Sequence, residues 1–150
     1  MMRDAIQGAL TDAQKSQDKC RTSTLRLVCA AMKDRDIAQR TAGKSPLSNA
    51  EILELLQKMV KQREESAITY ENAGRLELAD QERREIEVIR DFLPQPLADD
   101  AVRDAVADVI RETSAASVRD MGKCMAALKS KYPGQMDFGK ASGVVKEMLG

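Results

Sequence analysis

Apolar side chains recur every three or four residues along almost the whole chain, a spacing that is typical of amphipathic helices. No run of β-branched residues bounded by turns has the length of a strand. Aromatic residues make up only 3% of the chain and Trp is absent, so the core has to be built from aliphatic side chains, Met and Ala, which favour helices over sheets. The sequence therefore predicts an all-α fold. Residues expected on buried helix faces include Ile37, Ile68, Leu76 and Met148.

Glycines, prolines and capping residues divide this pattern into predicted helices. We expect them at about 2–18, 22–41, 48–74, 76–92, 98–113, 118–131 and 138–149. Ser48 and Glu51 have the spacing of a capping box, in which each side chain binds the backbone N–H of the other residue. Gly74 is typical of the position just after a helix C-terminus. The third and fourth helices, joined by 72–75, should therefore form an antiparallel hairpin.

Pro94 and Pro96 interrupt the helical pattern most clearly. Two prolines at alternate positions forbid a continuous helix and stiffen the connection between the elements on either side. We expect a helical domain over 1–93, a linker over 94–96 and a second domain over 97–150. The first domain would contain the long helices and the hairpin, and the second would contain three shorter helices.

The residue types needed for most catalytic and metal sites are missing or scattered. The absence of His removes the Ser-His-Asp triad, the Cys-His dyad and zinc sites with an imidazole ligand. Cys20, Cys29 and Cys124 form no C-x-x-C motif, so we expect reduced and mostly buried thiols. The segment 43–45 looks like the end of a phosphate-binding loop, but Ala38 stands where that loop needs its first Gly. We therefore expect no catalytic residue, no cofactor and no metal.

The N-terminus has no apolar run typical of a signal peptide, and no segment approaches the length of about 18 apolar residues that crosses a membrane. We expect a cytoplasmic protein with no membrane partner.

The charges of the whole chain cancel, with 24 basic and 24 acidic side chains and a pI of about 6.4. Their distribution is uneven. Residues 19–44 hold seven basic and two acidic side chains, 118–150 hold six and three, and 45–91 hold seven and eleven. A basic helix pair can meet a phosphate backbone, although a solvated charged face is the other interpretation of such a segment.

The most specific motif is the segment 120–129, DMGKCMAALK, which closely resembles the DMGKVM-x-AL signature of the GatB/YqeY family. Residues 25–33, 61–75 and 85–97 resemble further motifs of that family and stand in the same order, so the resemblance spans essentially the whole chain. Pro96 stands in place of the usual Gln of the family and Cys124 in place of Val. The last helix also lacks an Asn that is common in the family, so no role of that Asn carries over.

The resemblance implies a long-helix N-terminal unit followed by a small three-helix unit. In the tRNA-dependent amidotransferases, a similar module is the tail of the B subunit and helps to hold the tRNA. The family is also associated with carbon–nitrogen ligase activity that uses glutamine as amido-N-donor. The amidase and kinase parts that carry this chemistry have no counterpart in the sequence. We therefore expect an accessory module that binds tRNA without catalysis of its own.

The resemblance and the basic segments together nominate the residues that contact RNA. The predicted set is Gly122, Lys123, Lys129, Lys131, Lys140, Arg26 and Lys33. The lysines on 118–150 would bind phosphates, Gly122 would let a backbone approach closely, and the two cations of the first domain would extend the surface. Two alternatives remain: an adaptor that docks on a tRNA-handling enzyme or on the translation machinery, and a glutamine-dependent ligase.

Overall fold

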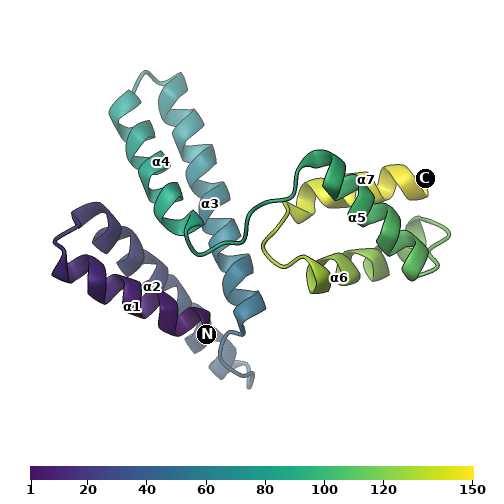
Figure 1. Cartoon of the computed structure of the whole chain (residues 1–150), viewed down its shortest axis with the longest axis horizontal. Helices are drawn as coiled ribbons and strands as arrows, with labels where there is room; N and C mark the ends of the chain where they lie inside the picture. The colour runs from purple at the N-terminus through teal and green to yellow at the C-terminus, as the bar shows by residue number, and fades with distance from the viewer. The chain divides into compact units, whose positions relative to one another are not determined.

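The computed structural model describes residues 1–150 and contains helices and connecting segments but no strand (Figure 1). This confirms the all-α prediction. The helices are α1 (Met2–Lys15), α2 (Lys19–Thr41), α3 (Asn49–Asn72), α4 (Leu76–Arg90), α5 (Asp99–Glu112), α6 (Met121–Lys131) and α7 (Phe138–Leu149). The helix predicted at 118–131 opens with a 3-10 turn, Val118–Asp120, and becomes α-helical only at Met121. None of the helices combines the length and the apolar character needed to cross a bilayer.

The turn between α1 and α2 lies three residues earlier in the chain than predicted. Gln17 has a φ of 60°, in the left-handed region, and α1 ends at Lys15 rather than at residue 18. Asp18 then caps α2, because its carboxylate accepts a hydrogen bond of 3.1 Å from the backbone N–H of Arg21. As a result α2 begins at Lys19 rather than at residue 22. A left-handed turn at a residue other than Gly is uncommon, so the sequence pattern did not indicate it.

The other helix ends are fixed by local hydrogen bonds. The backbone N–H of Glu51 donates to the Ser48 hydroxyl (3.2 Å), and the backbone N–H of Ser48 donates to the Glu51 carboxylate (3.1 Å), which confirms the predicted capping box. Gly74 follows α3 with a φ of 74°, in the left-handed region. The Asp137 carboxylate accepts from the backbone N–H of Gly139 at 2.9 Å and so caps α7.

The chain divides into two compact units, Met1–Leu93 and Pro94–Gly150. In the first unit α3 and α4 form the antiparallel hairpin, and α1 and α2 pack together and against it (Figure 1). Its large and deeply buried apolar side chains are Ile6, Leu25, Val28, Met32, Ile52, Leu56 and Ile89. This core does not reach the loop end of the hairpin, where Ala67 and Ala79 are buried outside the main cluster.

The second unit is a three-helix bundle in which α5, α6 and α7 all contact one another. Its core contains Val106, Val109, Cys124, Leu128, Ala141 and Val145. The backbone N–H of Leu97 donates to the carbonyl oxygen of Gln135 at 2.8 Å. This bond attaches the segment before α5 to the loop between α6 and α7.

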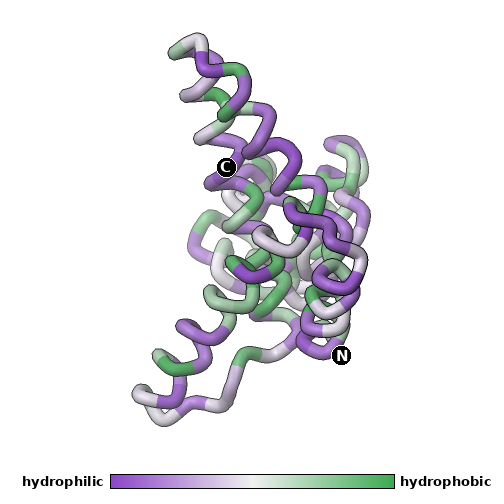
Figure 2. The backbone as a smooth tube through the Cα atoms, turned by 90° about the vertical axis from the view of Figure 1, so that its left-hand side faces the viewer, coloured by the Kyte–Doolittle hydropathy of each residue, from purple (hydrophilic) through white to green (hydrophobic).

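Four residues predicted to be buried are exposed. Ile68 and Leu76 are 55% and 63% exposed, and Ile37 and Met148 are exposed as well. Ile68 and Leu76 lie at the loop end of the hairpin, where hydrophobic positions occur among hydrophilic ones at the top of Figure 2. The prediction was wrong there because a periodic apolar face is buried only where another element covers it.

Candidate nucleic-acid interface

The predicted RNA-binding residues of the second unit all reach the surface. Gly122, Lys123, Lys129 and Lys131 lie on α6, and Lys140 lies in the first turn of α7. All five are exposed. Their backbone and side chains are therefore accessible to a ligand.

The outward face of α6 consists of the small residues Gly122, Ala126 and Ser130, which are all exposed. Residues four apart lie above one another on a helix, so these three form one row. Apart from the adjacent residues and the backbone of α6 itself, no atom lies within 4 Å of the position that a Cβ would take at Gly122, so the backbone there is open to the outside. Lys123 and Lys129 lie about 60° to either side of the row, from the helical rotation of 3.6 residues per turn. We call these five residues the α6 face.

Lys129 leans toward α7. Its Nζ lies 6.0 Å from the centroid of the Phe138 ring, at the outer limit of a cation–π contact. This contact leaves the positive charge unneutralised, because a ring carries no net charge. Lys129 therefore remains able to bind an anion.

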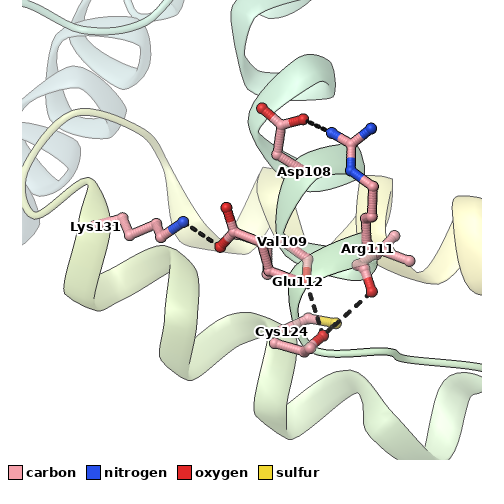
Figure 3. A network of polar contacts seen from close by, with 8 residues as sticks. Asp108, Val109, Arg111, Glu112, Cys124 and Lys131 are labelled. Atoms are coloured by element: carbon pink, nitrogen blue, oxygen red, sulfur yellow. Dashed lines mark hydrogen bonds and ion pairs between the residues drawn. The ribbon is translucent and has the colours of Figure 1, made fainter.

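Lys131 is placed differently from the other lysines. Its ammonium forms an ion pair with the Glu112 carboxylate of α5, as Figure 3 shows, and this contact raises the pKa of Lys131. On the helix Lys131 also points about 160° away from Lys129. The structure therefore separates Lys131 from the α6 face.

Lys123 is close to a carboxylate that already has a structural role. The Asp120 carboxylate accepts hydrogen bonds from the backbone N–H groups of Ala116 (2.9 Å) and Ser117 (3.4 Å) at the start of the 3-10 turn. The bond from Ala116 is the largest of the effects that lower the pKa of Asp120, and the charge of Lys123 adds to it. Lys123 forms no direct ion pair, so its ammonium stays available.

Arg26 and Lys33 belong to the other unit and lie on α2. Both are exposed and neither forms an ion pair within the chain.

The first unit also has a hollow that the sequence interpretation missed. It has a volume of about 530 Å³ and lies at the turn between α1 and α2. Its lining residues are Gln14, Gln17, Lys19, Thr22, Ser23 and Arg26. No binding role was predicted for Thr22 or Ser23 from the sequence. The seven-residue spacing of Lys19 and Arg26 was the signal that could have indicated a shared face.

No group of three or more Cys, Asp or Glu side chains is arranged to hold a metal ion, and no polar side-chain atom is buried without a partner. Burial raises the pKa of the Cys29 thiol, which favours the unreactive protonated form. Cys124 is buried, with its Sγ 3.7 Å from the hydroxyl of Thr113, and belongs to the network in Figure 3.

Comparisons with known proteins agree with the resemblance in the sequence. A family model described as Yqey-like protein matches residues 3–149. The uncharacterized protein C22F3.15 of Schizosaccharomyces pombe is 29% identical to this chain over 94 residues, which cover 63% of this chain and 73% of that protein. Because the family model covers essentially the whole chain, this protein belongs to the YqeY-like family.

Proposed function

We propose that this protein is a free-standing RNA-binding accessory module with tRNA as its favoured ligand and no catalysis of its own. The observation that carries this proposal is the α6 face, where Lys123 and Lys129 flank the row of small residues that begins with the open backbone at Gly122. The same segment carries the motif that resembles the tail module of the tRNA-dependent amidotransferases. With tRNA as ligand, the protein would work in the cytoplasm.

The chemistry of the α6 face suits a phosphate backbone. The row of small, outward-facing residues lets an RNA backbone approach the helix. The two flanking ammonium groups can each replace condensed counterions on the RNA. Such contacts position the RNA without reading its sequence. Lys140 would extend this surface on α7, whereas Lys131 would contribute less because Glu112 already neutralises it.

Reversing the two flanking charges tests the proposal. The variant Lys123→Glu/Lys129→Glu should bind a tRNA transcript more weakly, and the slope of log K against log salt should fall by about 0.7–0.9 for each lost phosphate contact. The control variant Lys58→Glu/Arg84→Glu makes the same change in net charge at exposed cations of the first unit. Equal binding by the two variants, or no tRNA binding by the wild-type chain at low salt, would rule out the proposal.

A second candidate function is a protein adaptor, and the loop end of the α3–α4 hairpin favours it. Ile68, Leu76 and Leu78 are exposed there, on a hairpin with an excess of acidic residues. A partner that uses this surface should survive nuclease treatment in a pull-down and be lost from Ile68→Asp/Leu76→Asp. The variant Leu27→Asp, at an exposed apolar residue of α2, is the control. Recovery of only nuclease-sensitive material would count against the adaptor.

A further inference from the structure

One face of α2 carries a row of cations at a constant spacing of seven residues. The row consists of Lys19, Arg26, Lys33 and Arg40, which are all exposed. Seven residues are close to two helical turns, so each cation is rotated by only about 20° from the previous one. With a rise of 1.5 Å per residue, the row is about 31 Å long and its steps are about 10.5 Å. We call it the α2 basic face.

The α2 basic face is not neutralised within the chain. None of its four cations forms an ion pair, although other arginines of the same unit do, such as Arg21 with Asp91 and Arg63 with Glu85. The nearest acidic residues on α2 are Asp34, about 100° around the helix from Lys33, and Asp36, which is bound by Arg3. Aligned like charges repel one another, so an anionic partner would be attracted to this face.

The hollow at the turn between α1 and α2 lies at one end of this face. Lys19 and Arg26, two cations of the α2 basic face, line the hollow together with Thr22 and Ser23, which carry hydroxyl groups. The lining contains two glutamine side chains from α1 and the following turn, and no carboxylate. Ammonium, guanidinium, hydroxyl and amide groups are the donors that bind phosphate oxygens. The carboxylate of Asp18 is not in the lining and is occupied by the backbone N–H of Arg21.

We propose that the α2 basic face binds consecutive phosphates of an RNA backbone and that the hollow holds one of them. This inference extends the proposed function by giving the first unit an RNA surface of its own. It differs from the proposal for the α6 face in the residues that it requires.

The composition of the face favours RNA over the two other kinds of anionic partner. A helix that lies on an anionic membrane needs a broad apolar face, but Ile37 is the one large apolar side chain within this row. Protein interfaces are rich in aromatic anchors and poor in lysine, and α2 contains no aromatic residue. A single row of positive charges matches the phosphate backbone of RNA better than it matches a membrane or the surface of a protein.

The test removes the four charges without reversing them. The variant Lys19→Gln/Arg26→Gln/Lys33→Gln/Arg40→Gln is compared with Lys15→Gln/Arg35→Gln/Lys58→Gln/Arg84→Gln, which removes four exposed cations of the same unit that lie off the row. Binding of a tRNA transcript is measured by titration at several salt concentrations. We expect the first variant to bind tRNA about tenfold more weakly or worse, and the slope of its log K against log salt to fall by about three. The slope of the control should fall by less than about one.

A single substitution on each side of α2 makes the comparison sharper. Arg26 and Arg35 are both exposed arginines of the same helix, and they lie about 180° apart. Arg26→Gln should weaken binding and Arg35→Gln should not. Thermal melts followed by circular dichroism check that each variant is folded.

The outcomes separate this inference from the proposed function. Weaker binding by the α2 variant alone supports the α2 basic face and contradicts the α6 face. Weaker binding by Lys123→Glu/Lys129→Glu alone, with the α2 variant equal to its control, overturns the inference and leaves the proposed function standing. The inference is also overturned if the wild-type chain binds anionic phosphatidylserine vesicles or an acidic protein but no RNA.

Discussion

Arg3 and Asp36 form a two-point ion pair, with Nη1 2.6 Å from Oδ2 and Nη2 3.0 Å from Oδ1. The same Asp36 Oδ1 accepts a hydrogen bond of 2.9 Å from the backbone N–H of Leu47, and Arg3 donates to the Leu47 carbonyl oxygen at 3.3 Å. One carboxylate thus connects the start of α1, the last part of α2 and the segment before α3. The hydrogen bond from Arg3 is the main reason that the pKa of Asp36 lies below its ordinary value.

This arrangement predicts a stability that depends on pH in the acid range. The pKa of Asp36 is lower in the folded chain than in the unfolded chain. The carboxylate therefore contributes fully to the free energy of unfolding at pH values above the ordinary aspartate pKa of 3.8, and this contribution is lost as the pH falls through the lower pKa of the folded chain. At pH 7 the variant Asp36→Asn should lose about 1–3 kcal/mol of unfolding free energy. Urea titrations from neutral to acid pH measure this loss, which should shrink below pH 3.8. Asp34→Asn is the control, and a loss of equal size there would contradict the prediction.

Glu82 should have the opposite effect. Burial is the main cause of its raised pKa, and the neighbouring Glu85 adds to it, so the folded chain disfavours the ionised form. This penalty on the free energy of unfolding is present in full at pH values above the raised pKa of the folded chain. It disappears at pH values below the ordinary glutamate pKa of 4.5. Glu82→Gln should therefore raise the melting temperature at pH 7 and leave it unchanged at pH 4 in calorimetry. A lower melting temperature at pH 7 would show that the carboxylate stabilises the fold.

Removing the Ser48 hydroxyl should weaken the start of α3. Ser48→Ala deletes the acceptor for the backbone N–H of Glu51, and loss of such a cap costs about 1 kcal/mol. Chemical denaturation measures the change. Ser45→Ala removes a hydroxyl in the preceding loop and should change the free energy of unfolding by less than half as much.

Lys131 and Lys129 should differ in RNA binding although they are only two residues apart. Glu112 binds the Lys131 ammonium, whereas Lys129 faces only the Phe138 ring. Lys129→Gln should weaken tRNA binding and flatten its salt dependence, and Lys131→Gln should leave both nearly unchanged. If Lys131→Gln has the larger effect, the ion pair does not persist in the complex.

The fold follows from the sequence where its signals are local. The signals that end or begin a helix are the capping pair Ser48 and Glu51, the glycine at 74 and the two prolines. Each of them affects only the residues next to it in the chain, so the sequence shows where helices start and stop. The left-handed Gln17 has no such signal. Ile68 was assigned to the core because periodicity tells which side of a helix is apolar, not whether a second element covers that side.

The candidate sites divide in the same way. Gly122, Lys123 and Lys129 were found because they belong to a contiguous motif. On α2, Arg26 and Lys33 were predicted to contact RNA, but Lys19 and Arg40 were not. The summed charge of a segment ignores rotation around the helix, and only the seven-residue spacing shows that the four cations share a face. Only the structure shows that Glu112 binds Lys131, since nineteen residues separate them.

The small size of Ala67 and Ala79 affects how readily the loop end of the α3–α4 hairpin opens. They are the buried apolar side chains at that end, and alanine contributes little buried area to hold two helices together. That part of α3 and α4 should therefore open locally at a small fraction of the free energy needed to unfold the core. Amide hydrogen exchange there would be fast in the isolated chain, and its slowing by a partner would map the contact while the rest of the unit stays protected.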